Sequence, residues 1–534
     1  MTSTHHRGWS GLRIGDMLGD QAAGNHDREL FCFEDHRVTY GTFHAWVEDV
    51  AADLVAHGVR PGDRVMVQLP NCLEALVLQM AAFRIGAINT PVVPIYREHE
   101  VRQIISDCLP AAIAVGEAWS DRDPAAEIDA LLDDLGHMPK VRYLVGAHRD
   151  GWSRPPAMVP AEQGSADRRS ADLPEPRDPE EPALLLYTSG TTSAPKGVLL
   201  TSRALIAHLR NFQTALRAGP DSVILVATPL SHLGGFIAGV VFPAFLGARS
   251  VVMPAWRPDE AVDVIERERA TIAMGATVFL SDLVQRYEAG AAPHHRLSLY
   301  ACAGATIPPS AITRAEAVGV EAMRCYGMTE TAGVCAAAPK DAPLYRRAEW
   351  DGRVLPDMRI EAVDHDRQPL PAGEEGELRI HGPQLLTAYT DPGLTAAQID
   401  DEGWFYPGDV GIVDDEGWVR MTGRIKDIIN RGGEKFSTLD IEAALSSHPD
   451  VDAVAVTAIP DDRLGEGVGA WLVLRAGAQW NGPRTFIEHL EEVHLARQKI
   501  PTYWEIVDHL PSTASGKIRK QELHVSPEGV RITR

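Results

Sequence analysis

Ala183-Leu-Leu-Leu-Tyr-Thr-Ser-Gly-Thr-Thr-Ser-Ala-Pro-Lys-Gly-Val198 is the most informative segment of this chain. Its first five residues form a short apolar run, which is typical of a buried strand. The run rich in hydroxyl groups and glycine predicts a loop, and Ser202 is placed to cap a helix. The apolar residues on one face of that helix are Leu205, Leu209, Phe212 and Leu216. We therefore expect a strand that leads through a loop into a helix.

The loop after this strand is suited to binding phosphate. Its backbone N–H groups can surround a polyphosphate, and Lys196 adds positive charge. It is not a Walker A loop, because Pro195 stands where glycine is needed and Gly197 stands where a magnesium-binding hydroxyl should follow the lysine. The pattern indicates a nucleotide site and disfavours a P-loop NTPase.

Further short apolar runs lie downstream, each followed by turn residues or a helical pattern. They cover residues 223–227, 271–274, 297–302 and 320–325. This alternation predicts an α/β fold with mainly parallel sheets wrapped by helices. Ligands bind beyond the carboxyl ends of the strands in such sheets, so we expect the polar motifs at the strand ends to share one site.

The pattern changes to a smaller α+β unit after Gly423. The elements expected there are helices near 440–447 and 486–495 and strands at 451–458 and 470–474. A chain of 534 residues also exceeds what one core usually supports. The domains we predict are a large N-terminal domain at 1–422, a hinge at 423–427 and a small mobile C-terminal domain at 428–534. Residues 151–182, rich in proline and charge, predict a surface linker.

The composition excludes several classes of protein. A formal net charge of -23 argues against a nucleic-acid partner. Six cysteines without a CxxC pair indicate neither a disulfide scaffold nor a zinc site. Residues 222–248 are uncharged but are interrupted by proline and glycine, so we expect buried core and no membrane span. Residues 1–10 lack the apolar stretch of a signal peptide, and we expect a cytoplasmic protein.

Six further motifs follow the phosphate loop. They are PLSHLGG at 229–235, YGMTE at 326–330, GEL at 376–378, WFYPGD at 404–409, GRIKDIINRGGE at 423–434 and PSTASGK at 511–517. This ordered set, from about Tyr40 to Lys520, resembles the superfamily of acyl-CoA synthetases, peptide-synthetase adenylation domains and luciferases. The resemblance implies an ATP-dependent carboxylic acid:CoA ligase. Such an enzyme forms an acyl adenylate and then a thioester, uses ATP, Mg²⁺ and coenzyme A, and releases AMP and pyrophosphate.

The resemblance also implies the residues of the nucleotide site. Those expected to bind ATP or AMP are Thr188, Ser189, Gly190, Thr191, Thr192, Lys196, Gly304, Ala305, Thr306, Tyr326, Gly327, Asp409 and Arg424. Asp409 would accept hydrogen bonds from both ribose hydroxyls, and Tyr326 would flank the adenine. The expected catalytic residues are Lys517, Thr329, Glu330 and His232, with Glu330 holding Mg²⁺. Lys517 would touch both the carboxylate and the α-phosphate, which orients the attack.

The acyl and thiol sites are implied in the same way. The wall of the acyl pocket would include Phe236, Ala276, Thr277, Gly304 and Met328. None of these residues carries a fixed charge, which favours an apolar or aromatic acid. The family resemblance makes Lys426 the hinge about which the small domain turns. That rotation would exchange Lys517 for Gly432 and Gly433, which leave a channel for a pantetheine arm.

Three departures from the family pattern leave the acid and the acceptor open. They are Pro407, Thr277 and the loose glycine-rich wall at 302–306. One alternative keeps the adenylation but passes the group to a carrier-protein thiol or an amine, including nitrite-adenylating, diazotase-like chemistry. An alternative of a different class is a catalytically silent nucleotide-binding protein. The joint presence of the expected cationic and acidic site residues argues against that last alternative.

Overall fold

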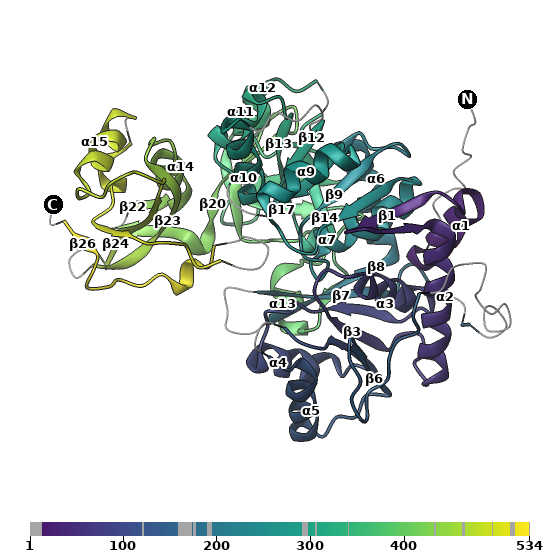
Figure 1. The fold of residues 1–534 in the computed structure, drawn as a ribbon. Helices are drawn as coiled ribbons and strands as arrows, with labels where there is room; N and C mark the ends of the chain where they lie inside the picture. The colour runs from purple at the N-terminus through teal and green to yellow at the C-terminus, as the bar shows by residue number, and fades with distance from the viewer. Residues whose placement is uncertain are drawn as a thin grey trace.

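The computed structural model describes residues 13–119, 122–158, 173–174, 178–189, 195–290, 297–304, 307–339, 341–431, 434–461, 465–493, 495–512 and 518–532. These residues form an α/β structure with four sheets (Figure 1). The predicted fold class is thereby confirmed.

The largest sheet has nine strands and carries much of the candidate site. Its order is β15 (Arg353–Val354), β14 (Gly333–Ala337), β13 (Ala322–Met328), β12 (Leu299–Cys302), β11 (Ile272–Gly275), β9 (Val223–Val226), β10 (Arg249–Val252), β1 (Glu29–Phe33) and β2 (His36–Thr39). The run from β13 to β1 is parallel. Its strands are short and apolar because both faces are covered. The runs predicted at 223–227, 271–274, 297–302 and 320–325 are four of these strands.

A second sheet of seven strands contains the phosphate loop. Its order is β18 (Ala388–Tyr389), β8 (Pro195–Thr201), β7 (Pro182–Ser189), β4 (Ile88–Pro91), β3 (Arg64–Gln68), β5 (Ala112–Gly116) and β6 (Val141–Val145). The strands from β7 to β6 are parallel, whereas β8 pairs antiparallel with both β7 and β18. The sequence predicted a strand, a loop and a helix, whereas the structure has a second strand, β8, between the loop and the helix. The strands on either side of the loop pair with each other, and β8 leads into the helix.

The helix after β8 is α6 (Ser202–Leu216), and its N-terminus differs from the prediction by one residue. Thr201 is the N-cap, because its side chain accepts a hydrogen bond from the backbone N–H of Ala204, and Ser202 is the first helical residue. The four apolar residues predicted for the buried face are all at most 2% exposed.

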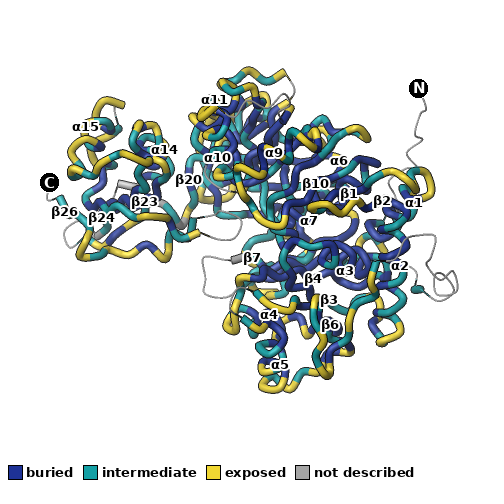
Figure 2. Tube along the Cα trace, in the orientation of Figure 1, coloured by how far each residue is buried: buried dark blue, intermediate teal, exposed yellow. Residues whose placement is uncertain are grey.

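Helices lie between the two large sheets. They are α3 (Leu73–Arg84), α7 (Leu233–Phe236), the π-helix η2 (Ile237–Val241) and α8 (Phe242–Leu246). Figure 2 shows that buried residues concentrate in this region, whereas an outer helix such as α5 (Pro124–Leu135) has both buried and exposed residues. The uncharged stretch 222–248 thus forms core, as predicted. Within the described residues, no helix has the length and apolarity needed to cross a membrane.

The remaining two sheets follow in sequence. An antiparallel sheet consists of β16 (Arg359–Val363), β17 (Glu375–His381), β19 (Asp409–Val413) and β20 (Val419–Arg424). The last sheet is built from β21 (Ile428–Arg431), β22 (Glu434–Ser437), β23 (Val451–Asp461), β24 (Gly465–Leu474), β25 (Tyr503–Ile506) and β26 (Val530–Arg531). Helices α14 (Thr438–Ser446) and α15 (Arg484–Glu492) pack on it around a separate core. Figure 1 shows this unit beside the rest of the chain, reached through β20. The hinge at 423–427 stays a prediction.

Candidate active site

A buried carboxylate joins three of the predicted nucleotide-binding residues. Asp409, at the start of β19, is the register partner of Arg424 at the end of β20. Nε of Arg424 lies 2.8 Å from Oδ1 of Asp409, and the hydroxyl of Tyr326 on β13 donates a 2.8 Å hydrogen bond to Oδ2. Asp409 is 0% exposed. Burial and the nearby carboxylate raise the pKa of Tyr326 well above its usual value, so its hydroxyl remains a donor.

Residues after β13 form a sharp turn that carries Glu330. The 3₁₀ turn η3 (Thr329–Thr331) is closed by Thr331 Oγ1, which accepts from the backbone N–H of Met328 at 3.0 Å. Gly333 then has a φ of +125°, and a Cβ there would lie 2.5 Å from the ring of His208. Glycine is required because of this close approach and this backbone conformation. The turn places the carboxylate of Glu330 within reach of Tyr389, whose hydroxyl donates to Oε1 at 3.0 Å.

Strands β7 and β8, which flank the phosphate loop in the sequence, pair as a hairpin. Thr188 and Lys196 are register partners at its base. Gly190, Thr191 and Thr192 lie outside the described residues, as does the side chain of Ser189. Gly197 packs against Thr390, whose backbone N–H donates to the Gly197 carbonyl at 2.8 Å. The hairpin therefore brings Lys196 to the strand edge where β18 pairs.

His232 lies at the N-cap position of α7, after β9. Its Nε2 is inaccessible to solvent and has no hydrogen-bond partner within the described part of the chain. Burial lowers the pKa of His232 to about 4, so the imidazole is neutral at pH 7. An unsatisfied buried nitrogen is costly, which is consistent with a group that meets a ligand there.

The turn that bears His232 is held by a residue that sequence reasoning missed. Asn71, which is buried, accepts a hydrogen bond from the backbone N–H of Leu230 at 2.8 Å. Its side-chain amide donates to the carbonyl of Met253 at 3.0 Å. Asn71 precedes α3, so this contact ties the turn to the helices between the two sheets. A lone asparagine has no sequence signal for this role, because its partners are backbone groups from distant segments.

Four residues predicted for the acyl pocket lie at the carboxyl ends of neighbouring strands in the nine-stranded sheet. Ala276 and Thr277 follow β11, Gly304 follows β12 and Met328 ends β13. These strands are parallel neighbours, so their carboxyl ends are adjacent. Phe236, the last residue of α7, is 1% exposed, and its ring stacks on Phe83 with centroids 5.6 Å apart. Its part in the pocket stays a prediction, and this core packing argues against it.

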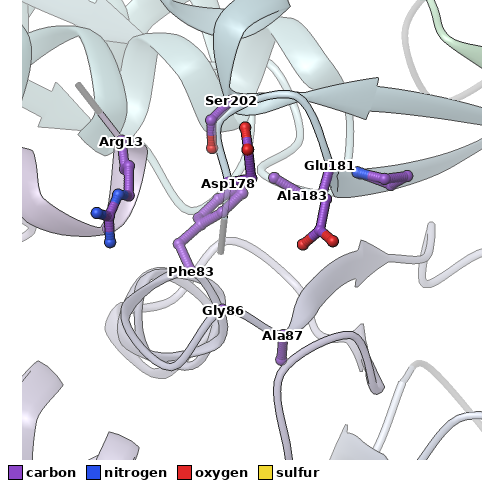
Figure 3. A pocket seen from close by; sticks show the side chains of 10 residues that line it. Arg13, Phe83, Gly86, Ala87, Asp178, Glu181, Ala183 and Ser202 are labelled. Carbon is purple, nitrogen blue, oxygen red and sulfur yellow. The ribbon is translucent and has the colours of Figure 1, made fainter. Parts of the chain in front are cut away.

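Several other predicted residues lie outside the described part of the chain. They are Ala305, Thr306, Gly432, Gly433, Lys517 and the side chain of Lys426. Gly327 is described and lies within β13. A small pocket lies elsewhere, between Phe83, Asp178, Glu181 and Ser202 (Figure 3). It adjoins the first residue of β7, at the opposite end of the strand from the phosphate loop, and is not the nucleotide site.

Glu330 suits a magnesium ion that arrives with nucleotide. Mg²⁺ binds through one or two carboxylates together with substrate phosphates, rather than in an all-protein cage. Glu330 offers one such carboxylate, one oxygen of which is fixed by Tyr389. Among the described residues, a cluster of three possible metal ligands is found only at Asp364, His365 and Asp366, between β16 and β17.

Comparisons with known proteins agree with this arrangement. Residues 18–390 match the AMP-binding enzyme family, and residues 440–517 match the AMP-binding enzyme C-terminal domain. The medium-chain fatty-acid–CoA ligase of Escherichia coli is 33% identical over 96% of this chain and 90% of its own length. The indoleacetate–CoA ligase of Aromatoleum aromaticum is 32% identical, covering 96% and 98%.

A solved structure supports the same assignment. ATP-bound MatB from Rhodopseudomonas palustris superposes with a TM-score of 0.83 at 28% identity, over 96% of this chain and 98% of that one. The likeness spans both family matches and nearly the whole chain. The chain therefore belongs to the AMP-binding enzyme family, within the acyl-CoA ligase branch of the adenylate-forming superfamily.

Proposed function

We propose that this chain is an AMP-forming acid–thiol ligase that uses ATP to join a carboxylic acid to coenzyme A. The observation that carries the proposal is the meeting of Tyr326, Arg424 and Asp409 at one buried carboxylate. They come from three separate motifs, and the family resemblance assigns each of the three residues to the nucleotide. The two relatives described above are both named as CoA ligases, which favours coenzyme A as the acceptor.

In the first half-reaction, an oxygen of the substrate carboxylate attacks the α-phosphorus of ATP. The new P–O bond forms as the bond to pyrophosphate breaks, which gives an acyl adenylate. Both reactants are anions, so positioned cations must offset their repulsion. We assign this role to Lys196 beside the phosphates, to Mg²⁺ held by Glu330, and to Lys517 between the carboxylate and the α-phosphate.

In the second half-reaction, the thiolate of coenzyme A attacks the carbonyl carbon of the adenylate, and AMP leaves. We assign the hinge to Lys426 and the channel for the pantetheine arm to Gly432 and Gly433. A change of orientation between the half-reactions would remove Lys517 and bring the glycines to the same site. Two chemical steps could then use one nucleotide position.

The acid is proposed to be apolar or aromatic. Ala276, Thr277, Gly304 and Met328 at the strand ends carry no formal charge. His232 is neutral at pH 7, so it would offer a hydrogen bond but no fixed charge to the substrate. The relatives' names specify a medium-chain fatty acid and indoleacetate, which both combine a carboxylate with an apolar body.

The test is a screen for acid-dependent exchange of labelled pyrophosphate into ATP. Aliphatic, aromatic and amino-substituted carboxylates are supplied singly, and every acid that supports exchange is then incubated with ATP and coenzyme A. The proposal expects exchange with at least one acid and a thioester detected by mass. Exchange with no thioester, but with amide or loaded carrier protein when those acceptors are added, would assign another acceptor. Absence of exchange with all acids would refute adenylation.

A further inference from the structure

A short segment, Gln384–Thr390, joins two parts of the candidate site that lie on different sheets. The backbone N–H of Leu386 donates to the carbonyl of Glu330 at 2.8 Å. The backbone N–H of Thr390 donates to the carbonyl of Gly197 at 2.8 Å, and β18 pairs with β8. The segment thus ties the turn that bears Glu330 to the strand that bears Lys196.

The side chain of Gln384 reinforces the contact with the turn. Gln384 is 0% exposed, and its Nε2 donates to the carbonyls of Thr331 and Val334, each at 3.0 Å. Its Oε1 accepts from Nδ2 of Asn211 on α6 at 2.5 Å. Both ends of the amide are therefore engaged, and a fully satisfied buried network rigidifies its surroundings. The side chain of Gln384 thus links the turn that carries Glu330 to α6.

Tyr389 extends the link from the backbone to the reactive side chain. Its residue is 3% exposed, and its hydroxyl donates to Oε1 of Glu330 at 3.0 Å. Tyr389 is also the register partner of Val198 on β8, so the same residue contacts the turn and the phosphate hairpin. A hydrogen bond from a rigid ring restricts rotation of the carboxylate, as outer partners of metal ligands commonly do.

We propose that Tyr389 is a positioning residue, which orients the carboxylate of Glu330 toward the magnesium ion of Mg·ATP and holds it at a fixed place relative to Lys196. The inference rests on the proposed function, because it takes Mg·ATP as the substrate. No sequence motif quoted above contains Tyr389. Its place in the site follows only from the contacts of β18.

The test compares Tyr389→Phe with a matched control. Tyr143→Phe removes a hydroxyl with the same chemistry, since Tyr143 is also buried and donates to a carboxylate, Oδ2 of Asp53, at 2.6 Å. Tyr143 lies on β6, at the far edge of the seven-stranded sheet from β18. Both variants lose one hydroxyl and one hydrogen bond, so a general loss of stability affects them alike.

Two measurements are made on each protein. The first is the dissociation constant of Mn²⁺ in the presence of a non-hydrolysable ATP analogue, followed by electron paramagnetic resonance of free Mn²⁺. The second is the Mg²⁺ concentration that gives half-maximal pyrophosphate exchange at saturating acid. We expect Tyr389→Phe to raise both by about tenfold, which is the lower end for partners of metal ligands. Tyr143→Phe should leave both unchanged.

Equal metal affinity in Tyr389→Phe, Tyr143→Phe and the unmodified protein would overturn the inference. A rise of the same size in both variants would also overturn it, because the effect would then be a general loss of order. The Mn²⁺ measurement needs no acid substrate. If no acid supports exchange in the unmodified protein, the proposed function fails while the binding comparison still decides the role of Tyr389.

Discussion

The hydroxyl of Tyr326 donates a 2.8 Å hydrogen bond to Asp409, from a different sheet, at a carboxylate that is 0% exposed. Arg424 holds the other carboxylate oxygen at 2.8 Å. A carboxylate has about four lone-pair sites on its two oxygens, so both oxygens keep capacity for further donors. The ribose role of Asp409 is thus compatible with its present partners.

The charge of Asp409 and its hydrogen bond from Tyr326 can be tested separately, with the variants Asp409→Asn and Tyr326→Phe. Asp409→Asn removes the negative charge that faces Arg424, and we expect pyrophosphate exchange to fall by about a hundredfold or more. Tyr326→Phe keeps the ion pair and removes only one hydrogen bond to a charged group, which costs about 1.5–3 kcal/mol of stability. Its exchange should fall by less than that of Asp409→Asn. Equal exchange in the two variants, measured at saturating ATP, would contradict the assignment.

Lys517→Ala and Gly433→Trp should affect different half-reactions. We expect Lys517→Ala to abolish pyrophosphate exchange, because a cation between two anions is lost. Gly433→Trp should retain exchange and block thioester formation, because a bulky side chain would fill the channel for the pantetheine arm. Exchange and thioester yield are measured on the same samples. If the two variants lost the same activities, the division of labour between the half-reactions would be wrong.

Gly197→Ala should disturb the phosphate hairpin through one neighbour. A Cβ at Gly197 would lie 2.6 Å from Oγ1 and 2.7 Å from Cγ2 of Thr390. Such overpacking typically costs about 1–3 kcal/mol, and the strain should move Lys196 and slow exchange. Thr390→Ala removes both clashing atoms, so the double variant should recover melting temperature and exchange relative to Gly197→Ala. Substitutions at two contacting residues are expected to be coupled. If the double variant did not recover, the defect of Gly197→Ala would not come from the clash with Thr390.

Stability should fall as the pH is lowered from 7 to 5, partly because of His208. Burial lowers the pKa of His208 to about 4, whereas an unfolded histidine titrates near pH 6.5. Between these values the unfolded chain binds more protons, so acid favours unfolding. This difference in protonation of His208 lowers the free energy of unfolding by about 2 kcal/mol at pH 5 relative to pH 7. In urea titrations, His208→Gln should lose less stability over this pH range than the unmodified protein.

The matched control for His208 is His365→Gln. The side chain of His365 is 88% exposed, so its replacement should leave the difference in stability between pH 7 and pH 5 as it is in the unmodified protein. The His208 assignment would be refuted if His208→Gln showed the same pH dependence as this control.

The parallel strands were predictable because each is a short apolar run between turn residues. Local patterns did not reveal β8, since the run from 195 to 201 begins in the loop motif and continues directly into α6. Its strand character comes from pairing with β7 and with β18, which lies almost two hundred residues away in sequence. Pairing at such separation leaves little trace in local composition.

Site residues that belong to a motif could be predicted from the sequence. Residues that only hold those side chains in position could not. Asp409, Arg424 and Tyr326 come from separate motifs, and the structure brings them together. Asn71 and Tyr389 contact the site through distant backbone and side-chain groups, so nothing in their neighbours marks them. Phe236 was predicted from its place beside a motif; its ring packs on Phe83 in the core, and its part in the acyl pocket stays a prediction.

Transfer of oxygen-18 from a labelled acid to AMP would show directly whether the enzyme adenylates the acid. An acid that supports pyrophosphate exchange is labelled in both carboxylate oxygens and incubated with ATP, Mg²⁺ and coenzyme A, and the nucleotide product is analysed by mass spectrometry. Attack of the carboxylate on the α-phosphorus predicts one labelled oxygen in each AMP, because AMP leaves the adenylate with that oxygen. Unlabelled AMP, or ADP as the nucleotide product, would contradict the account.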